Sequence, residues 1–173
     1  YKKLQSTNHL CTALTSDFDI RPFEPERDTA FIKQQNIDNW YMLHATPVFD
    51  IDFMLEHSAP YIQEPRFYGK LTTVVLFDNE GKHAGFVNFY MRGLYEGTVF
   101  LLAVDKNARG KGYGEALMRY AIEELKAQGA KYIKLSVRKK NESAKKLYHR
   151  CGFIQESSED DEEGFEFYRL NLP

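Results

Sequence analysis

The sequence has 173 residues, of which 43% are hydrophobic and 28% are charged. This length suits a single domain with a substantial core, and the composition is that of an ordinary soluble globular protein. A formal net charge of -2 gives no overall attraction to nucleic acid or to an anionic membrane surface, so neither is expected as a partner. The longest uninterrupted apolar run, residues 99–104, is far shorter than the roughly 18 residues that a membrane helix needs.

The start of the chain and its cysteines bear on origin and compartment. The sequence begins with Tyr1 rather than methionine, so we expect a fragment or a processed chain. Residues 1–16 are polar and irregular and lack the apolar centre of a signal peptide, which predicts a tail before one domain over residues 17–173. Cys11 and Cys151 make neither a disulfide framework nor a zinc cluster. We therefore expect reduced thiols, a cytoplasmic location and no bound metal.

The first part of the domain gives weaker patterns. Apolar and polar residues alternate around 18–23, which predicts a first strand ending near Pro22. A helix would follow, with Asp28 as its N-cap. The next segment, to about residue 65, is rich in aromatic residues and shows no strand period, so we expect one or two helices joined by loops there.

From residue 71 onward the pattern is clearer. Segments 71–77 and 83–91 flank the turn DNEG, which predicts a β-hairpin. Residues 98–104 form a near-continuous apolar run, typical of a central strand covered on both faces. The remaining elements are predicted, in chain order, to be a helix ending at Gly129, a strand over 132–137, a helix capped by Asn141 and ended by Gly152, and a final pair of strands over 153–156 and 165–172.

The order of these elements predicts the fold class. Strand, helices, hairpin, strand, helix, strand, helix and two strands make one mixed α/β sheet, an α+β arrangement, with a parallel crossover within residues 98–137. Neither an internal repeat nor a second-domain linker interrupts the pattern. We therefore expect a single domain.

The segment RGKGYG, residues 109–114, lies between the predicted central strand and the helix that follows it. Glycines at this point let an anion approach backbone N–H groups at a helix N-terminus, which favours a phosphate-binding loop. Glu115 stands where a dinucleotide fingerprint requires a third glycine. Asp105 and Gly112 stand where a P-loop requires a glycine and a Ser or Thr. Both nucleotide interpretations therefore fail.

The pattern Arg109-x-x-Gly112-x-Gly114 resembles the R/Q-x-x-G-x-G/A signature of the GNAT superfamily of N-acetyltransferases. A second segment, NESAKKLYHRCGF over residues 141–153, is similar to the N-x-x-A-x-x-L-Y-x-x-x-G-F segment of the same superfamily. The two motifs occur in the right order and on the predicted elements. The resemblance implies a GNAT-like acyl-CoA N-acyltransferase fold, with a central mixed, mostly antiparallel sheet flanked by helices, and acetyl-CoA as the cofactor.

The resemblance also implies which residues bind coenzyme A. The family holds the pyrophosphate at the glycine loop and pairs the pantetheine arm with the backbone at the end of the central strand. Core packing of residues 102–104 and helix capping by Asn141 would explain those residues without a ligand. The expected cofactor-binding residues are Leu102, Ala103, Val104, Arg109, Gly110, Lys111, Gly112, Tyr113, Gly114, Asn141, Ala144 and Tyr148.

Proton transfer is assigned to two side chains. In this superfamily a tyrosine at the position of Tyr148 often protonates the departing coenzyme A thiolate, so the resemblance implies a general acid there; a packing role is the alternative. Histone-type members carry a glutamate at the position that aligns with Thr98, so this sequence departs from that pattern. Glu96, two residues earlier on the same strand face, is the candidate general base. His83 and Glu56 are further candidates or solvated surface residues.

The acceptor is less well defined. The resemblance implies a primary amine, either a small molecule such as a polyamine or an aminoglycoside-like amine, or a protein amine, which attacks the thioester directly. The segment ESSEDDEE, residues 156–163, would attract a cationic acceptor if it borders the site, and would otherwise form a solvated hairpin loop. Homodimer formation is left open. The alternative function is a non-catalytic acyl-CoA-binding or regulatory module on the same fold.

Overall fold

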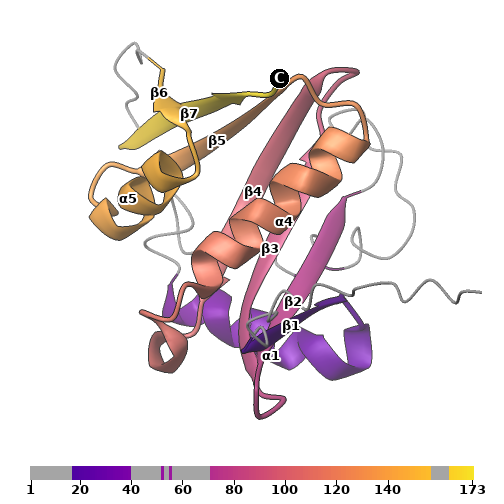
Figure 1. Ribbon diagram of the computed structural model, residues 1–173. Helices are drawn as coiled ribbons and strands as arrows, with labels where there is room; N and C mark the ends of the chain where they lie inside the picture. The colour runs from indigo at the N-terminus through magenta and orange to yellow at the C-terminus, as the bar shows by residue number, and fades with distance from the viewer. Residues whose placement is uncertain (1–16, 40–51, 53–54, 56–70, 157–163) are drawn as a thin grey trace, which may run out of the picture.

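The computed structural model describes residues 17–39, 52, 55, 71–156 and 164–173 (Figure 1). These residues form a seven-stranded sheet with the order β1-β2-β3-β4-β5-β7-β6. The strands are β1 (Phe18–Pro22), β2 (Thr72–Asp78), β3 (His83–Met91), β4 (Glu96–Val104), β5 (Tyr132–Arg138), β6 (Ile154–Gln155) and β7 (Phe165–Asn171). The helices are α1 (Pro25–Asp38), α4 (Tyr113–Ala127) and α5 (Glu142–Arg150), with a short 3-10 helix, η1, at Lys106–Ala108.

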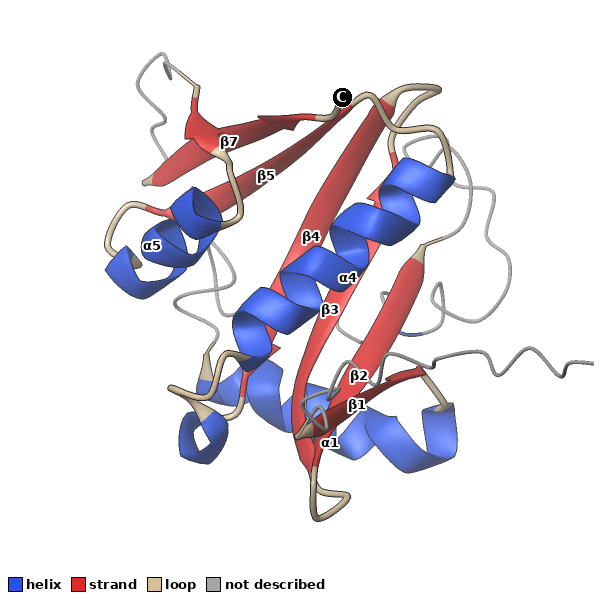
Figure 2. Cartoon of the chain, viewed as in Figure 1, coloured by secondary structure: helices blue, strands red, loops and turns tan. Residues whose placement is uncertain are grey.

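The strand pairing confirms the predicted sheet. Every neighbouring pair is antiparallel except β4 and β5, which are parallel and are connected through α4 (Figure 2). The β2–β3 hairpin and the final β6–β7 pair occur where the sequence predicts them. The predicted tail and most of the aromatic-rich segment lie outside the described residues.

Apolar layers cover both faces of the β2–β4 part of the sheet, and the two layers come from different helices. The apolar stripe of α4, including Leu117 and Met118, belongs to a cluster that contains Val87 on β3. On the opposite face, Ile32 of α1 belongs to a cluster that contains Phe86, the residue before Val87. This alternation is that of a strand buried on both faces. Within the described part of the chain, no helix is long and apolar enough to cross a membrane.

The start of α1 differs from the prediction. Asp28 is not the N-cap, because the helix begins at Pro25 and Glu24 occupies the cap position. Proline suits the first helical position because its φ is already helical and no N–H is needed there. The Asp28 carboxylate, fully buried within the first turn, instead accepts a hydrogen bond from the backbone N–H of Glu24 at 2.8 Å.

Candidate active site

Strands β4 and β5 separate along their length, and the separation opens a gap in the sheet (Figure 1). They pair only at Glu96, Gly97 and Thr98 of β4. Beyond Thr98, β4 keeps β3 as its neighbour but pairs with no other described strand on the β5 side. Backbone N–H and C=O groups along that edge need hydrogen-bond partners. An extended ligand chain lying in the gap would supply them.

A β-bulge changes which β4 side chains face α4 and which face α1. Phe100 is an extra residue opposite the β3 partners Asn88 and Phe89. Val99 packs in the α4 layer, whereas Leu101 packs in the α1 layer. In a regular strand residues two apart point to the same face, so the bulge reverses the alternation in the second half of β4. Leu102 consequently reaches the α4 side, where it lines a cavity.

The turn between β4 and α4 presents backbone N–H groups to the same cavity. Gly110 and Gly112 adopt φ angles of +81° and +82°, in the left-handed region that favours glycine. Gly112 is the N-cap of α4 and has no side chain to satisfy the first N–H groups of the helix. These N–H groups lie at the positive end of the helix dipole, an arrangement that suits an anionic ligand.

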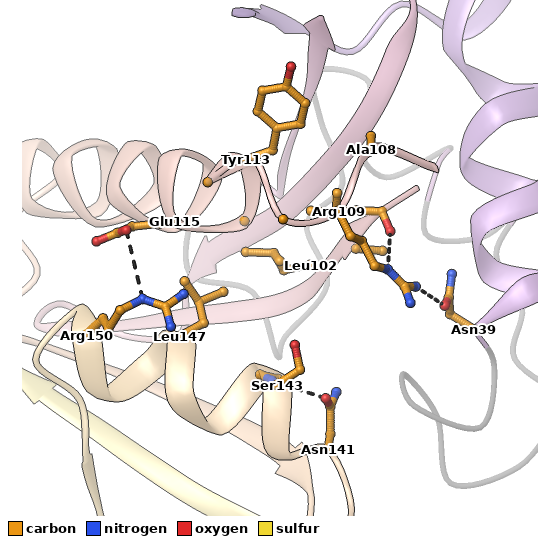
Figure 3. Close-up of a pocket in the computed structure, with 16 residues that line it drawn as sticks. Asn39, Leu102, Ala108, Arg109, Tyr113, Glu115, Asn141, Ser143, Leu147 and Arg150 are labelled. Atoms are coloured by element: carbon orange, nitrogen blue, oxygen red, sulfur yellow. Dashed lines mark hydrogen bonds and ion pairs between the residues drawn. The ribbon is translucent and has the colours of Figure 1, made fainter. Parts of the chain in front are cut away.

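The cavity itself has a volume of about 370 Å³ and lies between the end of β4, the N-terminus of α4 and α5 (Figure 3). A Cβ atom at Gly114 would lie 3.2 Å from the Leu147 side chain, so glycine allows α4 and α5 to approach closely here. The lining residues are Asn39, Leu102, Ala103, Val104, Ala108, Arg109, Gly110, Gly112, Tyr113, Gly114, Glu115, Asn141, Ser143, Ala144, Leu147 and Arg150.

The electrostatics of the cavity favour a phosphate-bearing ligand. The side chain of Asn141 accepts a hydrogen bond from the Ala144 backbone N–H at 3.1 Å and starts α5, so a second helix N-terminus reaches the cavity. Arg109 and Arg150 contribute guanidinium groups, and Arg150 lies 4.0 Å from the Glu115 carboxylate. Helix N-termini and guanidinium groups both bind phosphate oxygens well.

Most of the cofactor-binding residues predicted from the sequence come together at this cavity. All of them line it except Lys111, which is exposed, and Tyr148. The predicted cofactor-binding residues that do line the cavity are Leu102, Ala103, Val104, Arg109, Gly110, Gly112, Tyr113, Gly114, Asn141 and Ala144.

Tyr148 lies in the α5 side of the core, next to the cavity-lining Leu147. Its side chain is only 8% exposed, and its ring lies 6.1 Å, centroid to centroid, from the rings of both Phe153 and Tyr168. Burial raises the pKa of the Tyr148 phenol, because a phenolate is poorly solvated there. A phenol is protonated at neutral pH even without this shift, so the hydroxyl carries its proton.

Glu96 lies at the start of β4 and does not line the cavity. Its carboxylate accepts a hydrogen bond from the Tyr132 hydroxyl at 3.2 Å and lies 3.7 Å from the Arg92 guanidinium. Thr98, on the same strand, has a buried hydroxyl that makes no hydrogen bond with any described residue. It occupies the last paired position of β4 before the gap opens.

The remaining base candidates lie elsewhere. His83 is not a solvated surface residue: its Nε2 lies 2.9 Å from the Asp28 carboxylate, and its ring packs against Phe31 and Phe77. It does not line the cavity. Glu56 lies outside the described residues.

Several lining residues were missed by the sequence analysis. Most lie within or beside the two motifs, so listing every residue of each motif would have found them. Asn39 carried no such signal, because it lies 70 residues before Arg109 and contacts it only in the fold. The residues missed are Asn39, Ala108, Glu115, Ser143, Leu147 and Arg150.

Comparison with known families agrees with this geometry. Residues 34–153 match the acetyltransferase (GNAT) family, and this range contains the glycine loop, the gap-lining half of β4 and the whole of α5. The match covers more than half of the chain. The chain therefore belongs to the GNAT family.

Individual relatives match over segments of different lengths. A [ribosomal protein bS18]-alanine N-acetyltransferase from Haemophilus ducreyi is 42% identical over 62 residues, covering 36% of this chain and 43% of the relative. A mycothiol acetyltransferase from Actinosynnema mirum is 26% identical over 136 residues, covering 78% of this chain and 43% of the relative. The matched segments thus span less than half of the length of these curated relatives.

Solved structures extend the similarity to nearly the whole chain. The ribosomal-protein-S18-alanine N-acetyltransferase from Escherichia coli superposes with a TM-score of 0.61 at 25% identity, covering 89% of this chain and 93% of that one. A putative acetyltransferase from Salmonella typhimurium, solved with its cofactor acetyl-CoA, gives a TM-score of 0.68 at 19% identity and covers 91% and 95% of the two chains. The second similarity concerns the fold alone.

Proposed function

We propose that this protein is an N-acetyltransferase that moves an acetyl group from acetyl-CoA to a primary amine. The observation that carries the proposal is the continuity of two features: the gap between β4 and β5 runs into a cavity walled by the N-termini of α4 and α5. Such a site suits a long ligand with a phosphate-rich end and an extended arm. Acetyl-CoA has this form and supplies the activated acetyl group.

Arg109 and the N-terminus of α4 would hold the pyrophosphate. The edge of β4 that borders the gap, around Leu102 to Val104, would pair with the amide-containing arm and hold it extended. A backbone N–H on this edge would donate to the carbonyl oxygen that becomes negatively charged during transfer. A fixed donor at that point stabilises the transition state without reorganisation.

The transfer step requires two proton movements. The amine nitrogen forms a bond to the acetyl carbonyl carbon, and the carbon–sulfur bond breaks. The departing thiolate takes the proton of the Tyr148 hydroxyl, which a phenol carries at neutral pH. The attacking nitrogen loses a proton to a general base.

Glu96 remains our candidate for that base, acting through water. Thr98 lies between Glu96 and the gap, on the same face of β4, and its buried hydroxyl has no partner among the described residues. A water bound to this hydroxyl would span the ~7 Å between alternate strand positions. The amine proton would then pass through that water to the Glu96 carboxylate.

For the acceptor, we propose a small primary amine or a protein amine. The relatives named above comprise one that acts on a ribosomal-protein alanine and one that bears the name mycothiol acetyltransferase, so both classes are represented. Glu156, the first acid of the predicted negative rim, forms ion pairs with Lys134 and Arg169 at 3.6 and 3.9 Å. Its charge is therefore already compensated, and attraction of a cation would rest on residues 157–163, which lie outside the described residues.

One observation favours a second candidate, a non-catalytic acyl-CoA-binding module. Neither Tyr148 nor Glu96 lines the cavity. A module of this kind would bind acetyl-CoA without transferring its acetyl group.

An acetylation screen separates the two functions. The protein is incubated with acetyl-CoA and a panel of polyamines, aminoglycosides, amino acids and peptides, and products are detected by mass spectrometry. The proposal predicts a gain of one acetyl group on at least one amine, with release of coenzyme A. Binding of acetyl-CoA with no acetylated product across the panel would favour the module.

A further inference from the structure

Four polar side chains form a chain of hydrogen bonds that connects α1 with the segment between β4 and α4. They are Gln35, Asn39, Asp105 and Arg109. The Gln35 side-chain NH₂ donates to the Asp105 carboxylate at 2.7 Å. The Asn39 NH₂ donates to the Gln35 side-chain carbonyl at 3.3 Å and to its backbone carbonyl at 3.0 Å. Arg109 donates to the Asn39 side-chain carbonyl at 2.9 Å, a contact seen directly in Figure 3. We call these residues the relay.

The order of donors and acceptors along the relay is set by its two charged ends, Asp105 and Arg109. The oxygens of the Asp105 carboxylate accept hydrogen bonds, so Gln35 turns its NH₂ toward them. That leaves the Gln35 carbonyl for Asn39, and Asn39 must in turn offer its carbonyl to Arg109. Arg109 can only donate. Each amide is therefore oriented by the charge beyond it, and the order is consistent from end to end.

Burial makes the orientation of the Gln35 and Asn39 amides costly to change. Gln35 is 2% exposed and Asn39 is 9% exposed, so neither amide can exchange its partners for water at low cost. Arg109 is also held by its Nε donating to the Val104 backbone carbonyl at 3.2 Å. These two contacts fix the guanidinium beside the cavity and leave its remaining N–H groups for an anion.

We propose that Gln35 is a positioning residue for Arg109: through Asn39 it holds the guanidinium in the orientation that binds the cofactor phosphate. This proposal rests on the proposed function, because it takes the anion at Arg109 to be the pyrophosphate of acetyl-CoA. Gln35 itself does not line the cavity. It acts only through the direction of the relay.

Exchanging the carboxylate of Asp105 and the amide of Gln35 tests the direction of the hydrogen bonds. Each single exchange should disrupt the relay, and the two exchanges together should restore it. Asp105→Asn places an NH₂ where the carboxylate oxygen was, because its other oxygen still accepts from the Asn107 N–H, so Gln35 must turn over and present its NH₂ to the Asn39 NH₂. Asn39 then either keeps its NH₂ on the Gln35 backbone carbonyl without a side-chain partner, or turns over and presents NH₂ to Arg109, so the relay is broken in both cases. Gln35→Glu instead sets two carboxylates against each other. In the double variant the new amide at 105 donates to the new carboxylate at 35, which still accepts from Asn39.

The experiment measures acetyl-CoA binding by calorimetry and steady-state kinetics for these three variants. We expect each single variant to weaken acetyl-CoA affinity roughly tenfold, with KM raised and kcat little changed, and the double variant to bind within about threefold of the wild type. Gln35→Met, which keeps the length but removes the amide, should lose affinity and should not be repaired by Asp105→Asn. Gln128→Glu, the same change at an exposed position, should have no effect.

A second comparison tests that the relay acts through Arg109. In an Arg109→Ala background, Gln35→Glu should lower affinity by no more than about twofold. An undiminished tenfold loss in that background would overturn the proposal. So would single variants that bind like the wild type, or a double variant no better than the weaker single one. Wild-type protein that fails to bind acetyl-CoA would contradict the proposed function as well, whereas a binding wild type with an unrepaired double variant contradicts the relay alone.

Discussion

The Tyr148 hydroxyl is the only part of that side chain that differs from phenylalanine, and the ring already packs against Phe153 and Tyr168. Tyr148→Phe therefore preserves the packing and removes only the proton. We expect turnover with the best acceptor to fall by roughly 10²-fold, the lower range for a positioned acid, while acetyl-CoA affinity stays within about twofold. Steady-state kinetics and calorimetry measure the two quantities. Unchanged turnover would remove Tyr148 from the mechanism.

Asp28 shows how one buried charge ties together the start of α1 and strand β3. Burial alone would raise its pKa, but hydrogen bonds from Arg27, the Glu24 N–H and His83 outweigh burial and hold the pKa below its usual value. A lowered folded-state pKa stabilises the protein above the unfolded pKa of ~3.9. The stabilisation is lost as the pH falls through the lower folded-state value.

Asp28→Asn tests this linkage. At pH 7 we expect the free energy of unfolding to fall by about 2 to 4 kcal/mol, since Arg27 loses its buried partner. The difference from the wild type should shrink as the pH falls below ~4, where the unfolded wild-type chain begins to bind a proton at Asp28, and should disappear once the pH passes the lower folded-state pKa. Urea unfolding between pH 7 and pH 2.5 measures it, with the exposed Asp38→Asn as control. An equal difference at pH 3 and pH 7 would contradict the assignment.

At the scale of elements, the approach of α4 to the sheet depends on Gly85 of β3. A Cβ atom there would lie 2.8 Å from the Ala103 backbone carbonyl oxygen and 3.0 Å from a methyl carbon of Leu117. Gly85→Ala must therefore push β3, β4 and α4 apart, and we expect a destabilisation of about 1 to 3 kcal/mol.

The matched control is Gly93→Ala in the β3–β4 turn, where a Cβ would meet nothing within 4 Å. That change should alter the free energy of unfolding by less than about 0.5 kcal/mol. Chemical denaturation measures both variants. Equal effects would show that close packing at Gly85 is not what limits the approach of α4.

The helix starts could be predicted from the sequence, whereas the bulge in β4 and the relay could not. Gly112 and Asn141 were found because their roles are local: each is the N-cap of the helix that follows it. The bulge at Phe100 was not found, because an apolar run reads the same in either register and only the pairing with β3 reveals the extra residue. The relay was invisible for a different reason, since it joins side chains 70 residues apart.

On the scale of the whole molecule, the sheet is divided by its own central gap. The β1–β4 half carries α1 and α4 on opposite faces, and the β5–β7–β6 half carries α5 (Figure 1). The two halves are joined by only a short stretch of parallel pairing at the start of β4. A ligand lying in the gap would contact both halves, so cofactor binding should stabilise the fold as a whole.

Thermal unfolding with and without ligands tests this account most directly. Acetyl-CoA at about 100 times its Kd should raise the Tm by roughly 5 to 10 °C, because binding to the folded state alone contributes about 2.7 kcal/mol at that concentration. ATP and NAD at the same concentration should leave the Tm nearly unchanged, since the loop lacks the residues that their binding motifs require. Stabilisation by ATP or NAD without stabilisation by acetyl-CoA would contradict the account.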